Sequence, residues 1–303
     1  MNNHANRRIG VVGIGVMGFP IATHLRDSGF SVTVRDIRKE PMAAAFTAGL
    51  LTAASPAVLA AAVDFLIVIV VDKTQIDTVL FGDDGVIHRT RYSEAIPFPL
   101  TVLLCSTIAP EDVVRCASRL AEYGIETLDA PVSGGPIRTR SGSISMMLAG
   151  PTSTLERSAP LTEAMADKRF VISPQVGDAA RVKLVNNLLA GANLVAAAEA
   201  MALGARLGLD GQMLFDVINQ SSGSSWIFND RMARVLRDDF APRAALTLLT
   251  KDLSLATAMA ASVAQPTPVA DAALTVFRCA VAEYDGTLDD AAVIKVYKTA
   301  GRN

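Results

Sequence analysis

The chain has 303 residues, of which 50% are hydrophobic and 5% aromatic, and this length is enough for two domains of ordinary size. A formal net charge of −2 argues against nucleic acid or an anionic membrane as the main partner, and the apolar run FLIVIVV falls far short of the ~20 residues of a membrane span. The scattered cysteines, Cys105, Cys116 and Cys279, favour neither a disulfide framework nor a zinc site, so we expect a soluble cytoplasmic protein with no bound metal.

Short apolar runs alternate with stretches of helical spacing over the first 175 residues. The expected strands are RIGVVG, FSVTVRD, DFLIVIVV, PLTVLLCS and IETLDAP, followed by SISMMLAG and KRFVIS. The expected helices between them span residues 17–28, 39–48, 56–62, 75–80 and 110–123. This alternation predicts an α/β domain over residues 1–175, a doubly wound Rossmann fold whose parallel sheet is covered on both faces.

After Pro174 the pattern becomes almost wholly helical. Residues 178–208 are rich in Ala and Leu and contain no proline, so they could form one helix of ~30 residues. Further helical stretches are expected at residues 210–219, 226–237, 246–264 and 269–284. The sequence therefore predicts an all-helical second domain over residues 176–303.

The first expected strand ends in GIGVMG, residues 13–18, which opens the first expected helix. A tight turn that needs small residues would explain the glycines, and so would a phosphate-binding loop. In a dinucleotide site Gly13 allows the turn, Gly15 lets the backbone approach the pyrophosphate, and Gly18 permits close packing of the helix. We favour this interpretation and expect Ile14, Val16 and Met17 of the same loop to contact the cofactor.

Asp36 lies at the end of the second expected strand, about 20 residues beyond the glycines. A carboxylate there can accept both adenosine ribose hydroxyls and repels a 2′-phosphate, which favours NAD over NADP. Arg35 and Arg38 flank Asp36 and blur this choice, and an ordinary turn at the end of the strand remains an alternative.

Five segments in order resemble the β-hydroxyacid dehydrogenases, the family of 3-hydroxyisobutyrate dehydrogenase and tartronate semialdehyde reductase. They are GIGVMGFPIATHL, DAPVSGG at 129–135, GDAARVKLVNN at 177–187, SSGSSW at 221–226 and KDL at 251–253. The resemblance implies a fold like that of 6-phosphogluconate dehydrogenase. In the second half, GSSWIFNDRM, FAPRAALTLLTKDL and DDAAVIKVY are similar to the branch that oxidises four-carbon sugar acids such as L-threonate.

Lys183 is the candidate acid/base, because it lies in the first turns of the long helix, just after the expected domain junction. A lysine beside a positive nicotinamide ring in a partly dry cleft can have its pKa lowered toward the working pH. Asn187 lies four residues on, on the same helix face, and can bond the lysine or the substrate hydroxyl. The resemblance implies the same two roles, whereas the pattern alone also allows a solvated lysine.

The loop after IETLDAP carries Ser133, Gly134 and Gly135, whose N–H groups and hydroxyl can face a substrate carboxylate. An ordinary strand-exit turn is the alternative. In SSGSSW, Ser225 is a candidate contact for a polyhydroxylated substrate, and Trp226 either shapes a pocket or anchors the core.

Four further positions are expected to contact the cofactor. Thr107, Val70 and Val71 each lie just beyond an expected strand, where Rossmann ligands bind, although helix capping and core packing also explain them. Lys251 of KDL is implied by the resemblance as a contact near the nicotinamide, with Asp252 beside it to orient the amine.

The combined expectation is an NAD-dependent enzyme that oxidises a small hydroxy acid, L-threonate first among the candidates. A 3-hydroxyisobutyrate dehydrogenase or a tartronate semialdehyde reductase is the alternative of the same class. A non-catalytic dinucleotide-binding scaffold and an imine reductase are less favoured, because such relatives lack a lysine at the position of Lys183. The family and the apolar long helix imply a homodimer or homotetramer.

Overall fold

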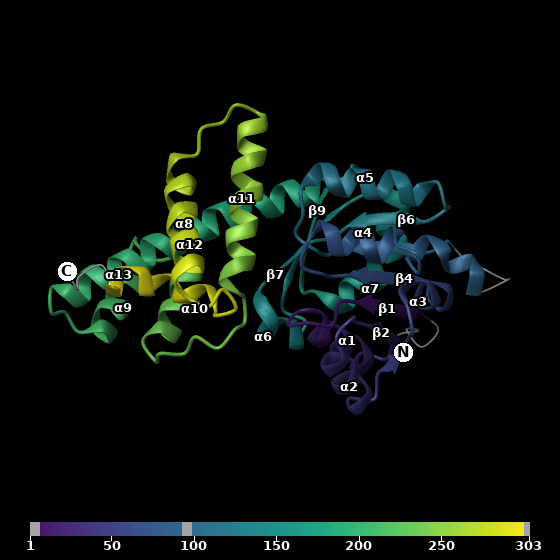
Figure 1. Ribbon diagram of the computed structural model, residues 1–303, viewed down its shortest axis with the longest axis horizontal. Helices are drawn as coiled ribbons and strands as arrows, with labels where there is room; N and C mark the ends of the chain where they lie inside the picture. The colour runs from purple at the N-terminus through teal and green to yellow at the C-terminus, as the bar shows by residue number, and fades with distance from the viewer. Residues whose placement is uncertain (1–6, 93–98, 300–303) are drawn as a thin grey trace. The chain divides into compact units, whose positions relative to one another are not determined.

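The computed structural model describes residues 7–92 and 99–299, and the chain divides into two compact units (Figure 1). Unit 1 is Met1–Lys183 and unit 2 is Leu184–Asn303. This division falls inside the long helix α8 (Asp178–Arg206), whereas the sequence places the domain boundary in the turn before that helix. The boundary at 175–176 therefore stays a prediction.

Unit 1 is built from alternating strands and helices. Its strands are β1 (Arg8–Val12), β2 (Ser31–Arg35), β3 (Leu51–Thr52), β4 (Phe65–Val68), β5 (Thr101–Leu104), β6 (Glu126–Asp129), β7 (Val132–Ser133), β8 (Ser145–Ala149) and β9 (Lys168–Ser173). Its helices are α1 (Gly18–Asp27), α2 (Lys39–Thr47), α3 (Pro56–Ala62), α4 (Lys73–Phe81), the 3-10 helix η1 (Val86–Tyr92), α5 (Pro110–Ala121), α6 (Gly135–Arg140) and α7 (Thr152–Met165). The five helices expected from periodicity are α1 to α5, each with ends within two residues of the prediction.

The sheet has the order β3-β2-β1-β4-β5-β6-β8-β7, with β9 on β8. The first six strands are parallel, so this part of the sheet is the doubly wound arrangement that the alternation predicted. The sheet is not parallel throughout, because β8 runs antiparallel to both β6 and β7. Residues 134–144, which join β7 to β8, hold only the six-residue α6, and a connection this short returns the chain in the opposite direction.

Helices cover both faces of this sheet. In β4, Phe65 and Ile67 belong to the core formed with α1, α2 and α7. The alternate residues Leu66 and Val68 belong to a second core with α3, α4 and α5. A strand buried on both faces is apolar at every position, which is why FLIVIVV showed no alternation.

Unit 2 is helical, as the sequence predicted. It contains most of α8 and, after it, α9 (Gly211–Asn219), α10 (Trp226–Val235), α11 (Leu246–Ser262), α12 (Pro268–Glu283), the 3-10 helix η2 (Asp290–Ile294) and α13 (Lys295–Thr299). Glycines allow close packing on α8, since an added Cβ at Gly191 would lie 2.7 Å from Leu253 and one at Gly204 would lie 2.1 Å from Leu214. Both α11 and α9 therefore pack closely on α8.

A buried ionic cluster joins α10 to η2 within unit 2. Arg234 Nη1 contacts Asp289 Oδ2 at 3.0 Å, and Arg231 Nε contacts Asp290 Oδ1 at 2.5 Å. Burial raises the pKa of Asp290 to about 6, although Arg231 opposes that rise. Asp289 also accepts hydrogen bonds from the N–H groups of Arg243 and Ala244, so the cluster fixes the loop that enters α11.

Candidate functional site

The glycine loop has the geometry that a dinucleotide turn requires. Gly13 has φ +89°, and an added Cβ there would lie 2.4 Å from the Ile69 carbonyl oxygen. An added Cβ at Gly18 would lie 1.9 Å from the Gly13 carbonyl oxygen. Both positions therefore exclude any side chain, the first by conformation and contact and the second by contact alone.

The start of α1 is suited to an anion. Met17, which precedes the helix, gives no side-chain hydrogen bond to its first N–H groups. These groups lack partners within a helix, and the helix dipole adds partial positive charge at this end. Among the described residues, an added Cβ at Gly15 would come within 4 Å of Arg38 Nη2 alone, at 3.4 Å. The residues from Gly13 to Gly18 therefore fit a pyrophosphate, with Gly15 left small for the approach of a ligand.

Asp36 is buried and holds Arg38. Its Oδ2 accepts from the Ile14 N–H and from Arg38 Nη2, both at 3.0 Å, and its Oδ1 accepts from the Arg38 N–H at 2.9 Å and from Nε at 3.0 Å. Burial raises the pKa of Asp36, but the bonds from Arg38 and Ile14 outweigh burial and leave the pKa below its usual value. Four bonds fill the acceptor sites of a carboxylate, so a ribose hydroxyl can bond Asp36 only by displacing Arg38. Sequence reasoning noted Arg38 but not this competition.

The carboxyl ends of β1, β4 and β5 bring three predicted cofactor positions to one edge of the sheet. An added Cβ on Gly13 would lie 2.8 Å from Val70 Cγ1, so Val70 packs on the glycine turn. The Val70 N–H donates to Ser106 Oγ at 2.8 Å, and Thr107 is the next residue. β1 and β4 are the neighbours at which the strand order reverses, and ligands of doubly wound sheets bind at this point. Val71 is 48% exposed at the same edge.

The DAPVSGG segment forms the end of β6, the strand β7 and the start of α6. Gly134 has φ +135° and Gly135 has φ +73°, two consecutive conformations that favour glycine. Ser133 pairs with Ser145 of β8, which fixes the backbone just before the glycines. This loop is thus held at one end by the sheet, and its role in binding a substrate carboxylate stays a prediction.

Lys183 and Asn187 lie one turn apart on the same face of α8, and each is 8% exposed. The Asn187 side-chain nitrogen donates to Asp252 Oδ2 at 2.7 Å. Lys251 Nζ donates to the other oxygen of Asp252 at 2.7 Å. The carboxylate of Asp252 therefore orients Asn187 and Lys251. The Asn187 oxygen accepts from Asn186 Nδ2 at 3.0 Å and keeps a second lone pair for a further ligand.

Ser225 is the N-cap of α10, since its hydroxyl oxygen accepts from the Phe228 N–H at 3.1 Å. This contact accounts for the serine by itself, so its role as a substrate contact remains a prediction. Trp226 is 53% exposed and does not anchor the core.

Asp129, the first residue of DAPVSGG, was missed by sequence reasoning. It is 1% exposed, and its Oδ2 accepts from the Gly177 N–H at 2.9 Å and from the Ala180 N–H at 3.0 Å, at the start of α8. Burial raises the pKa of Asp129 to about 6, and the hydrogen bonds from backbone N–H groups at the start of α8 oppose that rise. Its partners are 48 and 51 residues away in the chain, beyond the reach of any local pattern.

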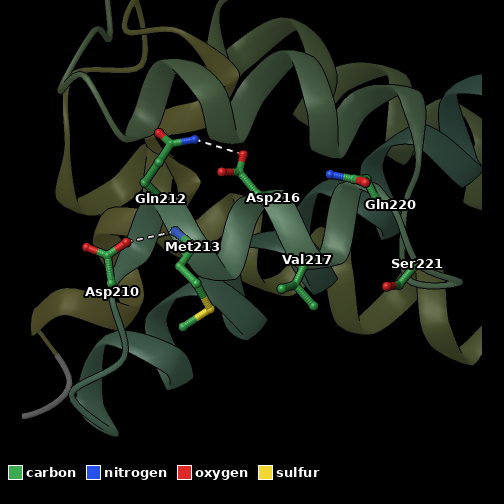
Figure 2. A pocket seen from close by; sticks show the side chains of 7 residues that line it. All are labelled: Asp210, Gln212, Met213, Asp216, Val217, Gln220 and Ser221. Carbon is green, nitrogen blue, oxygen red and sulfur yellow. Dashed lines mark hydrogen bonds between the residues drawn. The ribbon is translucent and has the colours of Figure 1, made fainter.

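A surface hollow is lined by residues of α9 and of the turns on either side of it (Figure 2). Its polar groups bond one another: Gln212 donates to Asp216 at 2.9 Å, and Asp210 caps α9 by accepting from the Met213 N–H at 2.7 Å. None of the predicted catalytic or binding residues lines it.

Comparison with known proteins agrees with this geometry. Residues 8–173 match the model of the NAD binding domain of 6-phosphogluconate dehydrogenase, and residues 177–297 match that of the NAD-binding domain of NADP-dependent 3-hydroxyisobutyrate dehydrogenase. The chain is 38% identical to the L-threonate dehydrogenase of Cupriavidus necator over 96% of each chain. It is 37% identical to the L-threonate dehydrogenase of Escherichia coli O6:H1, over 98% of this chain and 97% of that one.

A solved structure extends the match to three dimensions. The 3-hydroxyisobutyrate dehydrogenase from Salmonella typhimurium is 35% identical and has a TM-score of 0.87, over 96% of this chain and 100% of that one. Fold and glycine turn together define a dehydrogenase that uses a nicotinamide dinucleotide. Its two matched domains and its full-length relatives place the chain in the β-hydroxyacid dehydrogenase family, whose members oxidise small hydroxy acids.

Proposed function

We propose that this enzyme oxidises L-threonate, a four-carbon sugar acid, to the corresponding 2-oxo acid with NAD as the hydride acceptor. The choice of substrate is supported by sequence identities of 38% and 37%, over nearly the whole chain, to two proteins named L-threonate dehydrogenase. The runner-up substrate, 3-hydroxyisobutyrate, is favoured by the name of the Salmonella structure.

The cofactor would be held by unit 1. The loop from Gly13 to Gly18 and the uncapped start of α1 would bind the pyrophosphate, and Asp36 would accept from the adenosine ribose after Arg38 moves aside. Val70, Val71 and Thr107 would line the bound cofactor at the same edge of the sheet. When bound, the nicotinamide accepts the hydride that leaves the hydroxyl-bearing carbon of the substrate.

Lys183 would handle the proton. As the C–H bond breaks and its electron pair leaves as hydride, the neutral Nζ of Lys183 takes the hydroxyl proton and the C–O bond becomes a carbonyl. Asn187 would accept through its side-chain oxygen from the Lys183 amine, because its side-chain nitrogen is already bonded to Asp252. Lys251, held by the same carboxylate, would contact the cofactor near the nicotinamide.

The substrate carboxylate and remaining hydroxyls need their own partners. Ser133, Gly134 and Gly135 would present N–H groups and a hydroxyl to the carboxylate. Ser225 would donate its hydroxyl proton to a distal hydroxyl of the substrate while its oxygen continues to cap α10.

The test compares turnover of L-threonate, 3-hydroxyisobutyrate and tartronate semialdehyde by the wild type and by Lys183→Ala. We expect the highest kcat/KM with L-threonate and a fall in turnover of at least ~100-fold in the variant, with NAD binding kept. Arg181→Ala, which removes an exposed cation two residues earlier on α8, is the matched control and should keep turnover within about 2-fold. Unchanged turnover in Lys183→Ala would reject the acid/base assignment, and no turnover of any of the three substrates by the wild type would favour a scaffold.

The preference for NAD has a separate test. Asp36 predicts a higher kcat/KM with NAD than with NADP, because a carboxylate repels the 2′-phosphate. Equal values with the two cofactors would show that Asp36 does not select the ribose.

We further infer a cytoplasmic homodimer or homotetramer that associates through unit 2. One stripe of α8 carries Val185, Leu189 and Leu203, exposed by 59%, 59% and 58%, and Leu207, exposed by 67%, follows directly after the helix. Such a surface favours association with a second copy. α8 is also long and apolar enough to cross a membrane, but long core helices of soluble proteins share these properties. Light scattering after gel filtration tests the assembly, and a monomer would contradict it.

A further inference from the structure

The start of α8 is capped from a distance. Where a side chain caps a helix start, it usually belongs to the residue directly before the first turn. Here the carboxylate of Asp129, the last residue of β6, accepts from the N–H groups of Gly177 and Ala180, at 2.9 and 3.0 Å. The side chain that ends a sheet strand thus holds the first turn of the helix that carries Lys183.

The sheet fixes where this carboxylate lies. Asp129 pairs with Leu104 of β5 on one side and with Ala149 of β8 on the other. Four residues later the same segment reaches Ser133 in β7, which also pairs with β8. The predicted substrate loop and the cap of α8 are therefore parts of one short, sheet-bound segment.

The other buried contacts of the first turn of α8 come from small residues, while Asp178 bonds Ser173 and Arg181 at the surface. Gly177 has φ +103°, and an added Cβ there would lie 2.9 Å from Val114. Ala179 packs with Met147 and Ala149, and Ala180 joins the core on the α5 face of the sheet. Such contacts exclude water but are weakly directional, so among the buried contacts of this turn the bonds to Asp129 are those that oppose rotation and sliding of α8.

We propose that Asp129 is a positioning residue for the dehydrogenase reaction, which sets the place of Lys183 relative to the loop of Ser133, Gly134 and Gly135. Lys183 follows Ala180 by three residues, about one helical turn or ~4.5 Å of rise, so a shift of the capped N–H groups moves the amine almost equally. This proposal rests on the proposed role of Lys183. In this proposal Asp129 itself contacts neither the cofactor nor the substrate.

The test uses Asp129→Ala, Asp129→Asn and the matched control Asp178→Ala in the full-length enzyme. Asp178 is also a carboxylate at the start of α8, but it bonds Ser173 and Arg181 at the surface and not the buried N–H groups. The measurements are kcat and KM for the best substrate, the Kd of NAD, and hydrogen exchange of the peptide that covers residues 174–183.

We expect Asp129→Ala to exchange faster in that peptide and to lose about 10- to 100-fold in kcat, with the Kd of NAD within about 2-fold of wild type. Asp129→Asn should recover kcat to within about 3-fold, because its oxygen still accepts from the two N–H groups. Asp178→Ala should keep kcat within about 2-fold. A purely structural cap would lower the folded fraction without changing the kcat of the folded enzyme.

Wild-type kcat in folded Asp129→Ala, or an Asn variant as slow as the Ala variant, would overturn the proposal. If the Ala variant does not fold, Asp129→Asn still decides, since a loss beyond about 10-fold would contradict the acceptor role. Lys183→Ala in the same assay separates the two claims. If Lys183→Ala is inactive and Asp129→Ala is not, the positioning role alone fails; if Lys183→Ala is active, the proposed function fails first.

Discussion

Replacing Asp129 by Asn removes one titrating proton from the buried start of α8 and leaves an oxygen that can accept the same two N–H bonds. Burial raises the pKa of Asp129 from 3.8 to about 6, more than the helix N–H groups lower it. The side chain is 1% exposed, so solvent screening does not reduce this effect appreciably.

This shift gives the wild type a pH-dependent stability with a definite sign. Between pH 3.8 and about 6 the unfolded chain has released the Asp129 proton, whereas the folded protein still binds it. The free energy of unfolding therefore falls as pH rises through this range. About two pH units at about 1.4 kcal/mol each amount to a loss of about 3 kcal/mol, complete above the folded-state pKa.

The assay follows the unfolding of unit 1 in urea from pH 4 to pH 8 by labelling Cys105 and Cys116, which are buried in unit 1. An aromatic disulfide reagent that reacts with thiols in acid covers this pH range. Cys279 is exposed in the folded protein, so its labelling shows at each pH that the reagent is active. The wild type should lose about 3 kcal/mol relative to Asp129→Asn as pH rises. A difference in the free energy of unfolding between the two proteins that stays constant with pH would mean that the N–H groups balance burial. A difference that favours the wild type at higher pH would mean that they outweigh burial, and either result would refute the reasoning.

Two predictions concern the nucleotide loop. Gly18→Ala would place a Cβ 1.9 Å from the Gly13 carbonyl oxygen, so we expect a lower melting temperature as well as lost NAD binding. Gly15→Ala should have the melting temperature of the wild type but an affinity for NAD that is at least ~10-fold weaker in calorimetry. Equal melting of the two variants would contradict this distinction. Arg38→Ala removes the cation nearest Asp36 and should weaken NADP relative to NAD by at least ~10-fold, and an unchanged ratio of the two Kd values would mean that Arg38 does not meet the 2′-phosphate.

The sequence predicted most of the fold because periodicity is a local property. Residues 56–62 matched α3 at both ends, and the long Ala-rich stretch formed α8 over 29 residues. α7 was missed, since Pro160 lies inside it and its apolar residues follow no clear stripe. The antiparallel turn into β8 was missed because strand direction depends on pairing between distant segments.

The candidate site divides in the same way. Gly13 and Gly18 could be identified from spacing, because the turn they form is local in sequence. The bonds of Asp129 to α8 and of Asp252 to Asn187 join residues 48 to 65 positions apart, so no spacing rule reveals them. A carboxylate in a recognised motif is the one signal that pointed to Asp129, and the motif by itself does not say which group it binds.

Two helix starts in this chain show how the same backbone groups serve different ends. α1 begins without a side-chain cap and presents its N–H groups at the glycine loop, whereas α8 begins on the buried carboxylate of Asp129. The first start favours a phosphate, because no side chain caps it, whereas the second disfavours one, because the Asp129 carboxylate already accepts from its N–H groups. The first arrangement suits a ligand, and in our proposal the second holds a helix in register. Removing the carboxylate should therefore loosen α8 without creating a second cofactor site, because the N–H groups it leaves are buried beneath small side chains of unit 1.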